Sequence, residues 1–222
     1  MIENKLSFFF RHQVWHLGGT ILLFYIGAQM IDLDGNTNTF LGISALNWFM
    51  IAMFIPLIHQ AYVWVCWRSE LCWKSVSNSI GFKGYVIFFF ILANSRFLAI
   101  VLCFVDYGSL YKPGWFAWSL ALILFAPGAY TMYSVKKYFG FLRAAGADHF
   151  DPIYRDMPFE RRGIFKWSPN AMYKFAIGIP FALAVATGSQ SMFIVAIYTY
   201  ISIWLHYFCT EKEDFKVIYR NN

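Results

Sequence analysis

The stretch Leu41–Trp64, LGISALNWFMIAMFIPLIHQAYVW, decides the fold class because it contains no Asp, Glu, Lys or Arg. A helix that crosses a bilayer needs about 20 predominantly apolar residues, within a range of about 17–25. A helix that is apolar on all sides is either deeply buried or in a membrane. The stretch therefore predicts a membrane-spanning helix, with a kink expected at Pro56.

Further apolar runs of similar length lie on both sides of this stretch. They are Val14–Ile31, Tyr85–Val105, Trp115–Val135, Met172–Thr187 and Ser191–Cys209. The tight joint at Gly188 and Ser189 predicts that the last two runs form an antiparallel hairpin. We therefore expect an all-α, polytopic membrane bundle of about six transmembrane helices. It forms a single membrane domain over residues 1–222, with a cytoplasmic loop and a C-terminal helix.

Composition supports the membrane class. Hydrophobic residues make up 59% of the 222-residue chain and charged residues only 14%, whereas soluble domains carry about 25% charge. These values exclude a disordered chain, a coiled coil and most soluble enzymes. The four cysteines form no C-x-x-C pair and are interpreted as small apolar residues, so no metal site is expected. The N-terminus shows no removable signal peptide.

The distribution of Lys and Arg predicts the orientation. The chain has 18 basic residues. Alternate polar segments hold 15 of them, the intervening polar segments hold only Lys112, and Arg96 and Lys174 lie within or beside apolar runs. The positive-inside rule then places both termini and the long segment 136–170 in the cytoplasm, here expected to be that of a bacterial inner membrane. The same distribution accounts for the net charge of +6 without a nucleic-acid partner. The 15 residues are Lys5, Arg11, Arg68, Lys74, Lys83, Lys136, Lys137, Arg143, Arg155, Arg161, Arg162, Lys166, Lys212, Lys216 and Arg220.

Candidate functional residues gather in the long cytoplasmic segment and in the tail. The segment contains Asp148 and His149, followed by Arg161 and Arg162. The alternative interpretation is a solvated loop with surface salt bridges, although long loops are more often functional. The tail brings His206 to the interface, followed by Glu211 and Glu213. Its acidic groups are suited to bind a cation such as a sulfonium, and the alternative is a frayed, solvated helix.

Polar residues also interrupt the second and third apolar runs. Asn94 and Arg96 lie inside the third run, where an arginine costs about 2.5–3.5 kcal/mol on insertion scales. Arg96 should therefore face the bundle interior or a polar cavity, either as a ligand contact or paired with Asp106 or His59. For His59 and Gln60 in the second run, hydrogen bonding between helices is favoured over ligand binding.

Three motifs in the C-terminal half carry a family resemblance. They are KYFGFL at 137–142, NAMY at 170–173 and an acidic tail that ends in IYR at 218–220. With these motifs in this order, the chain resembles the membrane-embedded methyltransferases that include phosphatidylethanolamine N-methyltransferase and, more remotely, isoprenylcysteine carboxyl methyltransferase. The resemblance covers roughly residues 115–222. The proline of the family's N-P-M-Y motif is Ala171 here, and only Gly128 remains of its Gly-x-Gly element.

The resemblance implies S-adenosylmethionine as cofactor at the cytoplasmic face and a membrane lipid or lipophilic acceptor, most simply a phospholipid amine headgroup. It places the catalytic half at 136–222. It implies catalytic roles for His149, His206 and Glu211, because an amine acceptor must lose a proton before attack. It implies cofactor binding by Gly128, Tyr138, Asn170, Tyr173, Glu211 and Glu213. Asn94, Arg96, Arg161 and Arg162 are the expected substrate-binding residues, the last two as partners of a lipid phosphate.

Two other function classes remain open at this stage. One is a membrane reductase of the steroid-reductase type that binds a nicotinamide cofactor, which GIFKWSPN at 163–170 also resembles. The other is a non-enzymatic membrane subunit or transporter, for which the sequence shows no inverted repeat. The acidic tail ending in IYR favours the methyltransferases. The sequence does not identify the methyl acceptor or the oligomeric state.

Overall fold

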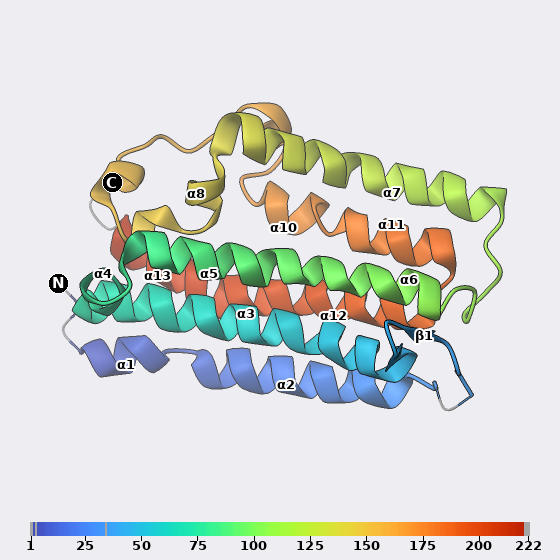
Figure 1. Cartoon of the computed structure of the whole chain (residues 1–222). Coiled ribbons are helices and arrows are strands. Elements are labelled where there is room, and N and C mark those ends of the chain that lie inside the picture. Colours follow the sequence, from blue (N-terminus) through green and yellow to red (C-terminus); the bar gives the residue numbers. More distant parts are fainter. Residues whose placement is uncertain (1, 3, 34, 220–222) are drawn as a thin grey trace.

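The computed structural model describes residues 2, 4–33 and 35–219, and its helices lie lengthwise in one bundle (Figure 1). Asp34 of the first predicted loop and Arg220 of the IYR motif lie outside the described residues. The elements are α1 (Lys5–Phe10), α2 (Gln13–Met30), β1 (Thr39–Phe40), β2 (Ile43–Ser44), α3 (Ala45–Trp73), α4 (Ser75–Asn78), α5 (Gly81–Ser95), η1 (Arg96–Val101), α6 (Leu102–Val105), α7 (Trp115–Ser134), η2 (Val135–Phe139), α8 (Phe141–Ala144), η3 (Ala147–His149), α9 (Pro152–Arg155), η4 (Gly163–Lys166), α10 (Ala171–Phe175), α11 (Gly178–Thr187), α12 (Gln190–His206), η5 (Tyr207–Glu211) and α13 (Lys212–Ile218).

Four continuous helical segments in the described part of the chain are long and apolar enough to cross a membrane. They are Ala45–Trp73, Gly81–Val105, Trp115–Phe139 and Gln190–Ile218, while Ala171–Thr187 is a shorter apolar segment. The all-α membrane class is thus supported, and the count of six spans stays a prediction. Only 17% of the apolar window in Gly81–Val105 and 22% of that in Trp115–Phe139 is buried inside the protein. Such exposed apolar surface is what lipid contact requires.

Two helices continue beyond the apolar runs predicted for them, and both extensions have the same cause. The second helix continues beyond Trp64 to Trp73, and the last helix continues beyond Cys209 to Ile218. The predicted basic loop therefore begins as helix, and the tail is not a frayed, solvated segment. Arg68 and Asp214 are fully buried and pair with each other. In the sequence these charges suggested that the spans had ended, but in the structure they neutralise each other inside the bundle.

The last two apolar segments form the predicted hairpin. Helix α11 ends at Thr187, and Gly188 takes a left-handed backbone (φ +61°) that suits a helix C-terminus. A side chain at Gly188 would collide with the Tyr111 carbonyl oxygen. The Ser189 hydroxyl then accepts a hydrogen bond from the Met192 amide and starts α12. Helices α11 and α12 pack against each other along this hairpin.

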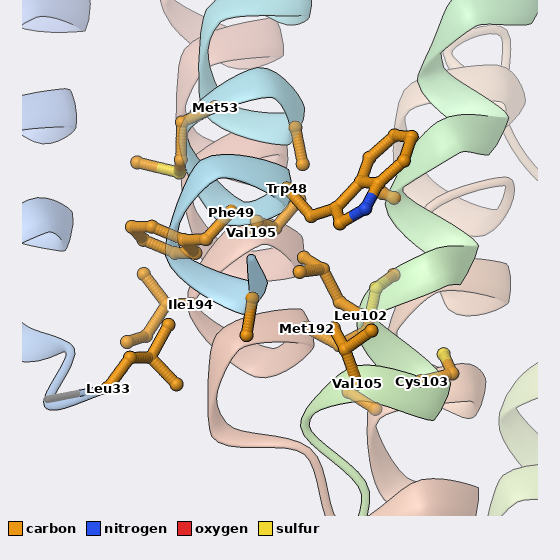
Figure 2. Close-up of a cluster of buried hydrophobic side chains, with 14 of the residues drawn as sticks. Leu33, Trp48, Phe49, Met53, Leu102, Cys103, Val105, Met192, Ile194 and Val195 are labelled. Atoms are coloured by element: carbon orange, nitrogen blue, oxygen red, sulfur yellow. The ribbon is translucent and has the colours of Figure 1, made fainter. Parts of the chain in front are cut away.

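Helix α12 is the centre of the bundle, because it packs against α2, α3 and α11. The largest buried apolar cluster lies between α3, α6 and α12, at the end of the bundle away from the termini (Figure 2). Phe49, Met53 and Leu102 are fully enclosed there. Helices α1 and α13 both lie at the opposite end of the bundle (Figure 1). This cluster fixes one end of the bundle, and the other end carries the polar groups.

Candidate functional site

A cavity of about 400 Å³ lies inside the bundle, between α3, η1, α10, α11 and α12. Most of its wall is apolar, and the volume falls near the lower end of the range for small-molecule sites, about 300–1,000 Å³. Half-exposed Phe97 and Met132 belong to the wall, so the cavity reaches the outer surface of the bundle beside α7. The polar side chains of the lining are His59, Gln60, Arg96, Tyr173, Thr199 and His206.

Three of these polar side chains lack hydrogen-bond partners among the described residues. They are His59 at both ring nitrogens, Arg96 at Nε and His206 at Nδ1. Both histidines are more than nine-tenths buried. Polar groups left unpaired in an apolar interior cost about 1–3 kcal/mol each, and more when charged. Their convergence on one cavity makes this cavity the candidate binding site of the described chain.

Tyr173 connects this cavity to the last helix. Its hydroxyl donates a short hydrogen bond to the Glu211 carboxylate, which is buried in the π-helical turn η5. Its ring packs against Trp204 and Tyr207, and the Asn170 amide lies 3.4 Å from the Tyr207 hydroxyl. Single π turns occur frequently at functional sites. The structure thus brings Asn170, Tyr173 and Glu211, three of the predicted cofactor residues, together at one end of the cavity.

A buried charge cluster lies beside this group at the end of the bundle that carries the termini. Arg68 Nε donates to Asp214 at 2.9 Å, and its remaining nitrogens donate to the carbonyl oxygens of Phe8, Phe9, Arg11 and Cys209. One guanidinium therefore ties α3 to both ends of the chain. A planar guanidinium with its fixed set of donors is suited to this role.

His149 extends the cluster into the long segment 136–170. Its Nδ1 lies 3.0 Å from Asp148 and its Nε2 lies 3.4 Å from Asp214, and its ring stacks on Trp67 at 4.1 Å. Burial lowers the pKa of His149, but its contacts with the two carboxylates outweigh burial and raise the pKa to about 9. The imidazole is therefore protonated at neutral pH and completely enclosed. This geometry does not favour the general-base role expected for His149.

His206 remains available, because its ring lies in the cavity wall and its Nδ1 is unpaired. The ring centroid of His206 is 5.1 Å from that of His16 and 5.7 Å from that of Trp67. His16 in turn contacts Gln13 at 2.9 Å and Gln60 at 3.2 Å. The two predicted catalytic histidines therefore have different surroundings: His149 lies between two carboxylates, and His206 lines the cavity.

The other predicted cofactor residues lie apart from the cavity. Gly128 is a contact between helices, because a Cβ there would lie 2.7 Å from the Ile179 side chain. Glu213 lies near the surface with its side chain 12% exposed, where it pairs with Lys216 and lies 3.9 Å from Arg11. Neither position supports the expected contact with the cofactor. Tyr138 packs under the Arg162 guanidinium in the segment 136–170.

The predicted substrate residues are also divided by the structure. Arg96 lines the cavity, whereas Asn94, two residues earlier, is exposed on the outside of the bundle. Residues two apart on a helix do not share a face. Asp106, a predicted partner of Arg96, instead accepts hydrogen bonds from Ser189 and Ser191, at the hairpin end of the bundle.

Arg161 and Arg162 lie on the exposed surface of the segment 136–170. Arg162 pairs with Glu160 at 2.8 Å, and this hydrogen bond lowers the pKa of Glu160 to about 2. A lipid phosphate would have to compete with this carboxylate for Arg162. The backbone amide of Arg161 donates to the same Glu160 carboxylate.

Sequence reasoning missed Arg68 and Asp214 as members of a site. Both were interpreted only through their charge, Arg68 as a marker of orientation and Asp214 as part of the acidic tail. The sequence did contain a signal: no turn residue separates Arg68 from the apolar run before it. A helix that continues to Trp73 places Arg68 within the bundle.

Comparison of the chain with known protein families, with curated proteins and with solved structures gives no match. The fold and the cavity define the chain as a helical membrane protein with a mostly apolar cavity in its bundle. What it does is therefore argued from the site itself.

Proposed function

We propose that this protein transfers a methyl group from S-adenosylmethionine to a lipid or lipophilic acceptor. The observation that carries the proposal is the meeting of Asn170, Tyr173 and buried Glu211 at one end of a cavity inside the bundle. Two motifs far apart in the sequence, NAMY and the acidic tail, are joined there by a hydrogen bond. They are two of the three motifs on which the resemblance to the membrane methyltransferases rests.

The residues present fit the cofactor's chemistry. Glu211 is an acidic group in an enclosed position, suited to a cationic amino or sulfonium group, and the Asn170 amide offers both donors and acceptors. When bound, S-adenosylmethionine supplies an electrophilic methyl group. The chain has to hold the two reactants in line and exclude water, and such positioning can contribute about 7–11 kcal/mol. His206 is the side chain in the wall that can accept a proton from an acceptor that carries one.

The proposal includes a location. The apolar helices place the protein in a membrane, and we infer a bacterial inner membrane with both termini in the cytoplasm from the basic residues near α1, η2 and α13. A lipophilic acceptor would then enter from the bilayer, beside Phe97 and Met132. A phospholipid amine headgroup is one such acceptor.

Ligand stabilisation tests the cofactor. Detergent-purified protein should gain several degrees in melting temperature with S-adenosylhomocysteine at about 100 times its Kd, because binding to the folded state then adds about 2.7 kcal/mol. NADPH should have no effect. Stabilisation by NADPH alone would instead identify a reductase.

Glu211→Gln tests the site. Hydrogen bonds to charged groups contribute about 1.5–3 kcal/mol, so the Kd for S-adenosylhomocysteine should rise at least about tenfold. Glu213→Gln is the matched control, because it makes the same change on the surface two residues later, and it should bind normally. Equal calorimetric affinities of both variants and the original protein would exclude Glu211 from the cofactor site.

A further inference from the structure

The cavity wall contains the Arg96 guanidinium, which forms no ion pair with any acidic side chain of the described residues. Arg96 follows directly after α5 and begins η1, a short 3₁₀ segment within the helix Gly81–Val105. A 3₁₀ stretch inside a longer helix often marks a functional position. None of the residues that line the cavity is an Asp or a Glu. A cation in such surroundings is costly unless an anion accompanies it.

Arg96 interacts electrostatically with Tyr198, Tyr173, His59 and His206, and none of these four side chains is a carboxylate. Both nitrogens of His59 and the hydroxyl of Tyr198 lack hydrogen-bond partners among the described residues. An anion held by Arg96 would therefore find additional donors beside it.

The rest of the wall determines the body of the ligand. Around Arg96 the cavity is lined by apolar side chains from four parts of the bundle, among them Phe89, Phe97, Ile100, Ile179 and Leu183. These surfaces favour hydrocarbon and offer no partners for further polar groups.

We propose that this cavity binds a lipophilic anion, that is, an apolar molecule with one negatively charged oxygen group, and that Arg96 and His59 hold this group. Arg96 and His59 lie in the N-terminal half, outside the motifs of the tail, and the rest of the wall includes α11 and α12. A ligand in this cavity lies next to Tyr173. The binding of the anion is independent of the proposed function, whereas the identity of this ligand as the methyl acceptor rests on it. A cationic ligand that carries no anionic oxygen of its own would meet the like charge of Arg96 and is disfavoured here.

The probe is radiolabelled dodecanoate, added to the full-length protein in a non-ionic detergent without S-adenosylmethionine. Dodecanol and dodecyltrimethylammonium have the same chain with a neutral and a cationic group. Dodecanoate should bind saturably, and each of the other two should compete at least about thirtyfold more weakly, because a buried charge contact is typically worth about 2 kcal/mol or more. Equal competition by all three would show that only the hydrocarbon is recognised and would overturn the proposal.

Variants locate the anion. Arg96→Gln should weaken dodecanoate binding at least about thirtyfold and leave dodecanol binding unchanged, while Arg96→Lys should retain most of the affinity. Lys112→Gln removes the same charge from an exposed turn and should bind as the original protein does. Unchanged dodecanoate binding by Arg96→Gln would overturn the proposal. If Arg96→Gln does not fold, the preference of the original protein for dodecanoate over dodecanol decides the question.

Competition by phosphatidylglycerol identifies the source of the anion. Displacement of dodecanoate by this lipid indicates an anionic membrane lipid, and no displacement indicates a single-chain acid. Because no cofactor is present, loss of dodecanoate binding overturns this inference without affecting the proposed methyl transfer. Failure of S-adenosylhomocysteine to bind overturns the proposed function without affecting the anion site.

Discussion

His149 was expected to act as a general base, but in the structure it is a buried member of a charge cluster. It lies between the carboxylates of Asp148 and Asp214 and is stacked on Trp67. The same contacts hold its proton and anchor the segment 136–170 to α3 and α13. The residue therefore links the pH dependence of stability to the packing of this segment.

The stability of the protein should depend on the protonation of His149. The folded-state pKa is raised from 6.5 to about 9, so its contribution is complete below about pH 6.5 and is lost as the pH rises through about 9. The melting temperature of the original protein should fall between pH 7 and pH 9.5. In His149→Gln the melting temperature should be lower at pH 7, and its decrease over this interval should be smaller.

Asp148 has the opposite dependence. Burial raises the pKa of Asp148, but the hydrogen bond to His149 and the neighbouring charges outweigh burial, so the pKa of Asp148 is lowered overall. Its contribution is therefore present above about pH 3.9 and is lost as the pH falls below its folded-state pKa. Stability should be greatest between these two transitions. Equal pH profiles for His149→Gln and the original protein would contradict the structural role of His149.

At the scale of elements, the contact between α7 and α11 depends on two glycines. A Cβ at Gly178 would lie 2.3 Å from the Leu124 carbonyl oxygen, and one at Gly128 would lie 2.7 Å from Ile179. Small residues allow helix backbones to approach closely in membranes, where water does not drive association. Gly128 thus has a packing role that accounts for its presence without a cofactor.

Gly178→Ala should destabilise the protein by about 1–3 kcal/mol, because backbone atoms would have to move apart. Gly18→Ala is the matched control in α2, where a Cβ would meet no atom within 4 Å. It should be neutral or slightly stabilising, because Ala favours a helix over Gly by about 1 kcal/mol. Denaturant titration in mixed micelles measures both. Equal stability of the two variants would show that α7 and α11 do not pack at this distance.

At the scale of the whole molecule, the predicted topology can be tested with reporters. Six spans with both termini in the cytoplasm follow from the distribution of Lys and Arg. A phosphatase fused after Gly188 should be active, and one fused at the C-terminus should be inactive, with a fluorescent-protein reporter giving the reverse. A periplasmic C-terminus would contradict this orientation and would also move the proposed cofactor site to the other side of the membrane.

The sequence by itself determined the membrane class, the central parts of the apolar helices and the hairpin at Gly188. These features depend on runs of apolar residues and on one turn, and both are local properties of the chain. It also pointed to NAMY and the acidic tail as residues of one site. Their physical contact through Tyr173 and Glu211 was not visible in the sequence.

Only the tertiary structure decided which polar residues share a site. Arg96 faces a cavity while Asn94 faces outward, and His206 borders the cavity while His149 is enclosed by two carboxylates. These differences arise from the rotation of each helix and from its neighbours, which are set by packing among segments far apart in the chain. In an apolar interior, the position of a charge and of its partner determines whether it is a structural pair or a binding group.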